Sequence, residues 1–347
     1  MKKREIYQLL WKTLKQEEKA STAVITKGKD QGSRAVWNPK KELLGTFGQA
    51  TEALWQQVVE EMDGKNGLRM INGEEVFVEY LTKQPKLVVC GGGHISKPIC
   101  QMGKMLDFHV TVVDDREEFA NEERFFMADQ VICCDYEELL HKVPFAPNTY
   151  YIVVTRGHRG DTCCVRQLLS YPCTYLGMIG SRKKVAITKE KLKAEGFTEE
   201  EIMGLYAPIG LKIGAQTPAE IAVSILAEII QVKNEKADGV MESSIGQQLE
   251  QEMAEGMMLT IVEKKGSSPR DVGSRMWICA DGHMEGSIGG GNAEYMAIQE
   301  AMENLKKEHK QQIWQQVFDM TNRESANTGM ICGGTVKVLF EYLPVKE

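Results

Sequence analysis

The stretch Lys86-Leu87-Val88-Val89-Cys90-Gly91-Gly92-Gly93-His94-Ile95-Ser96 decides the fold of the middle of this chain. An apolar run rich in β-branched residues leads into a triple glycine, and a helical pattern then continues to about Leu106. A second apolar run, residues 109–113, ends in Asp114-Asp115. This order of strand, glycine turn, helix, strand and acid is typical of a dinucleotide-binding βαβ unit. In that unit the glycines let backbone N–H groups approach a phosphate at a helix N-terminus.

The glycine turn has two interpretations. In the first it binds a nucleotide such as NAD(P), with Gly91, Gly93 and His94 near the phosphates and Asp114 on the ribose hydroxyls, because an acid about 20 residues after the turn has that role. In the second the turn is structural, as in many α/β folds that bind no nucleotide. Ser96 replaces the third glycine of the usual pattern, which weakens the first interpretation without excluding it.

Further β-rich runs at residues 130–134, 150–155 and 174–179 alternate with helical patterns, which predicts a parallel sheet with helices on both faces. Ligands of such folds bind beyond the carboxyl ends of the strands. Two polar loops, residues 155–161 and 177–182, follow strands there. The candidate residues in these loops are His158, Asp161, Ser181 and Arg182. His158 is either a proton donor or phosphate contact, or an ordinary loop histidine; Ser181 and Arg182 are either anion binders or a helix cap.

The two ends of the chain repeat one frame. Residues 32–37, Gly-Ser-Arg-Ala-Val-Trp, resemble residues 273–277, Gly-Ser-Arg-Met-Trp. Residues 77–81, Phe-Val-Glu-Tyr-Leu, resemble residues 339–343, Leu-Phe-Glu-Tyr-Leu. A structural unit used twice is the simplest explanation, and differences between the copies then point to function.

Only the C-terminal copy carries three polar or glycine-rich motifs. The candidate binding residues are Ser267, Ser268, Arg270, Gly289, Gly290, Gly291, Gly333 and Gly334, with Cys332 as the candidate reactive residue. Hydroxyls and a guanidinium suit a phosphate or oxoanion, and glycine amides before a helix suit an anion. A cysteine followed by two glycines can approach a bulky ligand, and its thiolate is a soft ligand or a nucleophile. Each motif alone is equally a tight turn.

Composition and charge argue against several classes of function. With 347 residues the chain can form two or three domains. A net charge of −7 disfavours non-specific nucleic-acid binding. No apolar run reaches membrane-spanning length, and polar residues interrupt the stretch behind the basic N-terminus, so we expect a cytoplasmic protein with no membrane partner. The nine cysteines and six histidines show no metal-ligand spacing, so no protein-bound metal site is expected.

These motifs resemble the XdhC/CoxI accessory factors of molybdenum hydroxylases such as xanthine dehydrogenase. Residues 266–270, 286–291 and 332–334 look like the XdhC/CoxI domain, whereas residues 88–93, 177–182 and 208–228 look like the family's Rossmann domain. The family usually places its XdhC/CoxI domain first, but here the first position holds a copy without the motifs.

The resemblance implies a non-catalytic chaperone that binds molybdenum cofactor, assists its sulfuration by a cysteine desulfurase and passes it to a molybdenum hydroxylase apoprotein. It further implies that Cys332 contacts the metal or its sulfur while Arg270 and the amides of residues 289–291 hold the pterin phosphate. A homodimer is expected by analogy. The alternative function is an NAD(P)-dependent oxidoreductase, although no convincing catalytic set accompanies His158.

The predicted fold class is therefore α/β, with a Rossmann-like parallel sheet and a small α/β domain present twice. The predicted domains are residues 1–84, a degenerate XdhC/CoxI-like copy; residues 85–234, Rossmann-like; and residues 235–347, the copy with intact motifs. We expect the degenerate copy to pair with the second copy, or with a partner chain, as a scaffold.

Overall fold

The computed structural model describes residues 1–143, 148–235, 239–251, 255–266, 270–319 and 334–345. Contacts divide the chain into two compact units. Unit 1 joins the two ends of the chain, Met1–Lys83 and Ala237–Glu347, and unit 2 is Gln84–Lys236. Within the described residues, no helix has the length and apolar character needed to cross a bilayer.

Unit 2 contains a parallel five-stranded sheet with the order β10-β9-β6-β7-β8. Its strands are β6 (Lys86–Cys90), β7 (His109–Asp114), β8 (Gln130–Cys133), β9 (Thr149–Val153) and β10 (Tyr175–Met178). Its helices are α3 (Ser96–Met105), the 3-10 turn η1 (Tyr136–Glu138), α4 (Leu139–Lys142), α5 (Gly157–Leu169), α6 (Arg182–Ala194), α7 (Glu199–Met203) and α8 (Pro218–Glu235). The predicted Rossmann-like sheet is confirmed.

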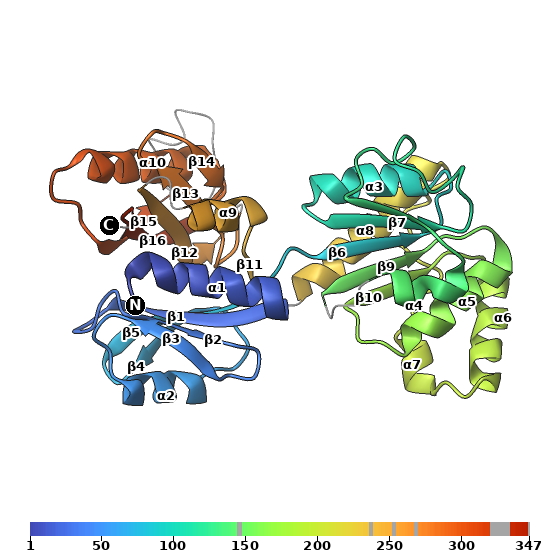
Figure 1. Cartoon of the computed structure of the whole chain (residues 1–347), viewed down its shortest axis with the longest axis horizontal. Helices are drawn as coiled ribbons and strands as arrows, with labels where there is room; N and C mark the ends of the chain where they lie inside the picture. The colour runs from blue at the N-terminus through green and yellow to red at the C-terminus, as the bar shows by residue number, and fades with distance from the viewer. Residues whose placement is uncertain (144–147, 236–238, 252–254, 267–269, 320–333, 346–347) are drawn as a thin grey trace. The chain divides into compact units, whose positions relative to one another are not determined.

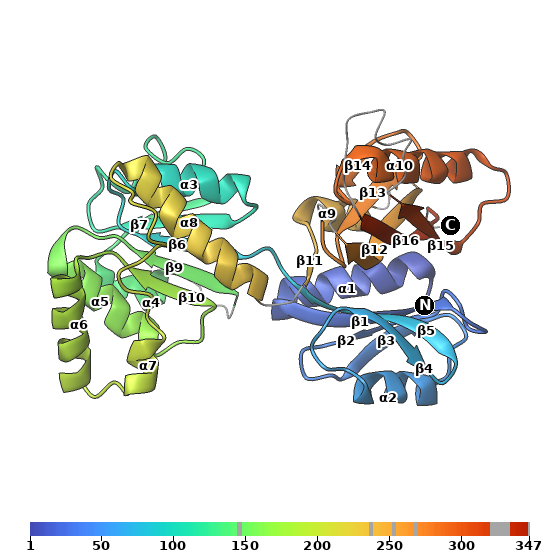
Figure 2. The same cartoon turned by 180° about the vertical axis from the view of Figure 1, so that it is seen from behind.

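Helices cover both faces of this sheet. Helices α3 and α8 pack on one face through Ile99 and Ile225, with the ring of Phe108 from the turn after α3. Helices α4, α5 and α6 pack on the other through Leu139, Leu168 and other fully buried side chains. Figure 2 shows α3 and α8 together over the face turned to the viewer. Both faces are therefore buried, as a parallel sheet requires.

Unit 1 consists of two modules with the same order of elements: a helix, three strands, a helix and two strands. The N-module contains α1 (Lys3–Glu17), β1 (Lys19–Lys27), β2 (Arg34–Trp37), β3 (Leu43–Phe47), α2 (Glu52–Glu60), β4 (Gly67–Ile71) and β5 (Glu74–Thr82). The C-module contains α9 (Ser243–Gln251), β12 (Gly256–Gly266), β13 (Arg275–Cys279), β14 (Met284–Gly286), α10 (Gly291–Lys306), β15 (Ile313–Asp319) and β16 (Gly334–Leu343). A short strand, β11 (Gly239–Val240), joins β5 in parallel.

The sheets of the two modules have the same strand order. The N-module sheet runs β3-β2-β1-β5, with β4 also paired to β5, and the C-module sheet runs β14-β13-β12-β16-β15. The first hairpin turns also match: Gly32 N donates to Ile25 O (2.9 Å), and Gly273 N donates to Ile261 O (2.8 Å). Both glycines have positive φ, 89° and 91°. The ladder between the first and last strands is interrupted after Ile25 in one module and after Ile261 in the other.

Two buried ion pairs join the modules reciprocally. Arg34 Nη2 lies 2.6 Å from Glu341 Oε2, and Arg275 Nη2 lies 2.5 Å from Glu79 Oε1. Arg34 and Arg275 begin the second strand of their modules, and the two glutamates occupy matching places on the last strand. Each module therefore gives an arginine to the other and receives one. In an isologous interface, a contact between residue i of one side and residue j of the other is repeated between residue j of the first side and residue i of the second, and these two ion pairs follow that rule.

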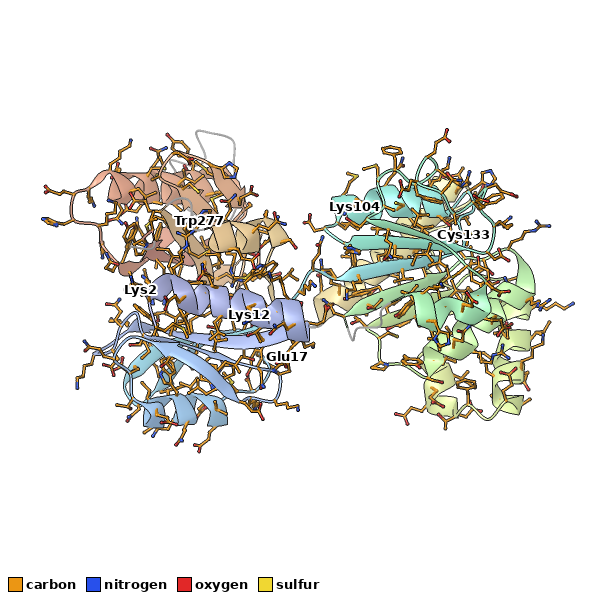
Figure 3. The ribbon with its side chains drawn as sticks, viewed as in Figure 1. Lys2, Lys12, Glu17, Lys104, Cys133 and Trp277 are labelled. Atoms are coloured by element: carbon orange, nitrogen blue, oxygen red, sulfur yellow. The ribbon has the colours of Figure 1, made fainter. Side chains whose placement is uncertain are left out.

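The helices of unit 1 form an inner and an outer set. Helix α1 lies between the two sheets and packs with α9; Figure 3 labels Lys12 and Glu17 on this helix and Lys2 directly before it. Its buried side chains share one core with β12, β13 and β16, including Trp277, which is fully buried. Helix α2 covers the outer face of the N-module sheet, and α10 covers that of the C-module sheet. The two modules thus share one core.

Candidate functional site

All three motif-bearing turns leave the same end of the C-module sheet. Gly266, the last residue of β12, pairs with Gly334, the first residue of β16. Strand β13 is antiparallel to both β12 and β14, so β14 also ends on this side, immediately before the glycine turn at residues 287–291. Ser267, Ser268, Cys332 and Gly333 lie outside the described residues, so the convergence of their side chains stays a prediction.

The glycine turn before α10 already holds an anion supplied by the chain. Glu294 Oε2 accepts hydrogen bonds from Ser287 Oγ (2.7 Å), Ile288 N (2.8 Å) and Gly290 N (3.0 Å). Gly289 N donates to Ser287 Oγ at 3.1 Å. Burial acts to raise the pKa of Glu294, but the hydrogen bonds to its carboxylate outweigh this effect and hold the pKa below its usual value. The turn has the geometry of an anion cradle, and an external anion there would have to displace this carboxylate.

The remaining described members of the motifs differ in exposure. Arg270 is exposed at the edge of this end of the sheet, and Gly334 is buried as the first residue of β16. Lys264 and Asp271 form an ion pair across the base of the turn that follows β12. Among the candidate residues of the C-module that the structure describes, Arg270 is therefore the charged side chain that is exposed to solvent.

The equivalent end of the N-module is closed by one glutamate. The carboxylate of Glu74, at the start of β5, accepts hydrogen bonds from Lys29 N (3.1 Å) and Asp30 N (3.4 Å). A Cβ on Gly28 would lie 2.0 Å from Glu74 Oε2, so the glycine is needed for this close approach. A short turn joins β4 and β5 where the C-module has residues 320–333. This end of the N-module is consequently filled by its own chain.

In unit 2 the glycine turn after β6 is packed against neighbouring backbone. Gly91 has φ of 115°, and a Cβ there would lie 2.4 Å from Val154 O. A Cβ on Gly92 would lie 2.1 Å from Phe119 O, whereas nothing lies within 4 Å of one on Gly93. His94, the next residue, is exposed. Two of the three glycines are thus required by the protein's own packing.

Asp114 does not present a free carboxylate for a ribose. Its Oδ2 accepts from Gly92 N (2.7 Å) and Arg116 Nη2 (3.1 Å), and its Oδ1 accepts from the backbone N (3.1 Å) and Nε (2.9 Å) of Arg116. The side chain is fully buried. Burial acts to raise its pKa, but the bonds from Arg116 and Gly92 hold the pKa below its usual value. These contacts reduce the support for the oxidoreductase alternative.

The other predicted residues of unit 2 have local structural roles. Asp161, fully buried, accepts from Thr155 N (3.0 Å) and Thr155 Oγ1 (2.7 Å) and forms an ion pair with Lys184. Ser181 caps α6 by accepting from Lys184 N at 3.2 Å, and Arg182 is the exposed first residue of that helix. His158 lies in the first turn of α5, but its side chain is outside the described residues.

Several charged residues of these sites were not predicted from the sequence. Glu294 follows the glycine turn by one helical turn, a position from which a carboxylate can reach back to amides at a helix start, so its spacing was an available signal. Arg156 and Arg159 flank His158 in the same loop, and their charge was a second such signal. Within the described residues, no group of three or more His, Cys, Asp and Glu side chains could hold a metal ion.

Comparisons with known sequences agree with this architecture. The sequence profile of the XdhC Rossmann domain matches residues 87–229, which span the parallel sheet. The profile of the XdhC and CoxI family matches residues 249–316, in the C-module. The chain belongs to the XdhC and CoxI family.

Individual relatives match only part of this chain. YqeB of Escherichia coli (strain K12), described as uncharacterised, is 34% identical over 167 residues, 48% of this chain and 30% of that protein. A protein of Bacillus subtilis (strain 168), named as a probable xanthine dehydrogenase component, is 30% identical over 193 residues, 56% of each chain. The chain thus spans 30% of the first relative and 56% of the second. A crystal structure of a xanthine dehydrogenase from Bacillus halodurans, 21% identical, superimposes with a TM-score of 0.52 over 66% of this chain and 63% of that chain, which shows a shared fold.

Proposed function

We propose that this protein is an accessory factor for a molybdenum hydroxylase of the xanthine dehydrogenase type. It binds molybdenum cofactor as cargo, assists its sulfuration by a cysteine desulfurase and delivers it to the hydroxylase apoprotein. The observation that carries the proposal is the common origin of the three turns at one end of the C-module sheet, where Gly266 pairs with Gly334 and β14 ends nearby. Membership of the XdhC and CoxI family supports it.

The donors at this end of the sheet fit a phosphorylated, sulfur-bearing guest. The turn at residues 287–290 binds a carboxylate of the chain through two amides and a hydroxyl, which are donors that a phosphate also accepts. Arg270, exposed after β12, would supply a positive charge. In this assignment Arg270 and the amides of residues 289–291 hold the pterin phosphate, and the thiol of Cys332 contacts the metal or its sulfur. The cofactor, when bound, supplies the redox-active metal that the hydroxylase needs.

Retention of the cofactor is the direct test. The chain, purified from cells that make molybdenum cofactor, should carry molybdenum and the absorbance of a pterin. Cys332→Ser should retain less molybdenum or activate the hydroxylase less. Cys133→Ser is the matched control, because Cys133 is an exposed free thiol in unit 2. A wild-type chain purified without pterin contradicts the proposal. A Cys332→Ser chain that activates the hydroxylase fully contradicts the role of the sulfur.

The carboxylate in the glycine turn offers a second, sharper test. If residues 287–291 hold the pterin phosphate, Glu294 competes with it, and Glu294→Ala should raise the affinity for inorganic phosphate and increase cofactor retention. We also propose a homodimer, which light scattering of the purified chain tests. If the Glu294→Ala variant binds phosphate no more tightly than the wild type, residues 287–291 are not part of the binding site.

A further inference from the structure

Helix α8 is apolar on its outer face as well as on the face that packs on the sheet of unit 2. Between Ile221 and Ile230 its sequence contains one charged residue, Glu228. The carboxylate of Glu228 is used within unit 2, where it accepts hydrogen bonds from Gly210 N (2.9 Å) and from the hydroxyl of Tyr175. A helix that is hydrophobic on all sides is normally buried, so we expect the outer face of α8 to be covered.

The outer face of α8 carries one stripe of uncharged residues. Ala219, Val223, Ala227 and Ile230 follow each other at helical spacing. Val223 is 48% exposed and Ile230 is 36% exposed. Helix α3, which packs on the same face of the sheet, instead exposes the charged Lys97 in its first turn. In Figure 2, α8 is the nearest layer of unit 2, and no described helix or strand of that unit lies over it.

The loop before α8 widens this apolar surface and is fixed to the helix. Ser224 Oγ donates to Leu211 O at 2.6 Å, and Leu211 N donates to Ser224 O at 3.2 Å. Gly210 has φ of 93°, and a Cβ there would lie 2.4 Å from Ser224 Oγ, so the close approach of loop and helix needs a glycine. Leu211 is 36% exposed and Ile213 is 53% exposed. Because the loop is already held in place, covering it costs little conformational entropy.

We call the surface formed by Leu211, Ile213, Val223, Ala227 and Ile230 the α8 surface. None of these residues is charged, so two copies of the surface can face each other without bringing like charges together. In an antiparallel arrangement about a two-fold axis, Val223 of one copy lies beside Ile230 of the other. The two Ala227 residues then meet near the axis, where their small side chains let the helices approach closely. Each helix end also lies beside the opposite partial charge of the other helix.

The area of the α8 surface is sufficient for a dimer. A helix of 18 residues is about 27 Å long. With the adjoining loop the surface is about 20 Å wide, because a helix with its side chains is about 10 Å across. Each copy therefore offers about 500 Å², and two copies bury about 1,000 Å² in total, which is the lower limit for a specific interface.

We propose that the α8 surface binds the α8 surface of a second copy of this chain about a two-fold axis. This inference rests on the homodimer proposed above and names the surface that forms it. The surface lies entirely in unit 2 and uses no residue of the candidate site in the C-module. Because the buried area is at the lower limit, the dimer should dissociate in the micromolar range.

Sedimentation velocity of the full chain at about 1 to 100 µM tests the proposal. The wild type should shift from monomer to dimer across this range. Val223→Glu places a charge in the contact of each copy, so it should weaken the dimer at least about a hundredfold and leave a monomer throughout. Met105→Glu is the matched control, because Met105 is an exposed apolar residue at the end of α3 and lies outside the α8 surface. This variant should form dimers as the wild type does.

A cysteine near the two-fold axis provides a second readout. Helices packed about 8–10 Å apart bring facing Cα atoms within reach of a disulfide. Ala227→Cys, made together with Cys133→Ser because Cys133 is exposed, should therefore form a disulfide-linked dimer when an oxidant is added. Ala194→Cys in the same background, an exposed alanine of α6, should not form one.

The outcomes separate this surface from the homodimer itself and from the cofactor site. A wild-type chain that stays monomeric overturns both the α8 surface and the homodimer; if Val223→Glu then also lowers the thermal midpoint, another part of the same chain covers the surface. A dimer that persists in Val223→Glu, without a cross-link at residue 227, overturns the α8 surface alone. Loss of the dimer in Met105→Glu as well would also contradict the assignment. None of these results changes the cofactor retention expected of the C-module.

Discussion

The reciprocal ion pairs between the two modules predict a large loss of stability from one isosteric substitution. Glu341→Gln keeps the size of the side chain and an oxygen for Tyr7, whose hydroxyl donates to Glu341 at 2.5 Å, but it removes the charge that Arg34 faces. Arg34 is 4% exposed and Glu341 1% exposed, so the arginine cannot turn to water. Burial acts to lower the pKa of Arg34, but Glu341 outweighs it and the pKa is raised, so the arginine stays charged.

Removing one partner of a buried pair costs about 3–5 kcal/mol. With a urea m value of about 2 kcal/mol per M, a loss of about 4 kcal/mol lowers the unfolding midpoint by about 2 M. Intrinsic tryptophan fluorescence follows this transition selectively, because all five tryptophans belong to unit 1. They are Trp11, Trp37, Trp55, Trp277 and Trp314. Circular dichroism of the same samples reports on both units.

An exposed pair across the same interface supplies the control. Lys15 on α1 and Glu250 on α9 are 42% and 43% exposed, so Glu250→Gln makes the same chemical change but should cost less than about 1 kcal/mol. The double variant Arg34→Met with Glu341→Leu should recover most of the loss, because an apolar pair leaves no buried charge. A midpoint for Glu341→Gln that equals that of Glu250→Gln would refute the reasoning.

Three further predictions concern packing and pH. Gly91→Ala should destabilise unit 2 by at least about 1–3 kcal/mol in urea unfolding followed by circular dichroism, because its Cβ would lie 2.4 Å from a backbone carbonyl; Gly93→Ala, with open space, should be neutral. Gly246→Ala should disrupt the packing of α9 on α1, because its Cβ would lie 2.3 Å from the Trp11 ring, and a changed fluorescence spectrum would report this. Glu294 has a lowered pKa, so its contribution to stability is present above pH 4.5 and is lost as pH falls through the folded-state pKa; Glu294→Gln should flatten that part of the stability profile.

Local patterns allowed prediction of much of the fold. The run from Lys86 to Asp115 predicted β6, α3 and β7 because apolar periodicity and glycine positions are properties of neighbouring residues. Helix α1 was not predicted, because the stretch after the basic N-terminus was tested only as an apolar targeting or membrane segment, and polar residues interrupt it. In the structure, however, Ile6, Leu10 and Leu14 recur on one face and are buried.

Long-range pairing explains why the sites were harder to predict. Lys3 and Arg4 are buried because carbonyls of Gln312, Pro344 and Gln248, more than 200 positions away, accept their hydrogen bonds. No local pattern indicates such partners. The same holds for Asp114, whose predicted ribose contact depends on where the Arg116 side chain lies. The three motif turns could be placed at one sheet end only once the register of β12 with β16 was known.

Because the two modules that exchange arginines belong to one chain, a mutation can alter one side of their contact without altering the other. In an assembly of two identical chains, one gene encodes both sides, so any altered codon appears twice and both sides must tolerate it. Here each side of the contact has its own codons. One half can shorten a loop and fill it with Glu74 while the other keeps a long segment at residues 320–333, and the shared centre of four charges survives both changes. Specialisation of one half is thereby separated from the maintenance of the contact.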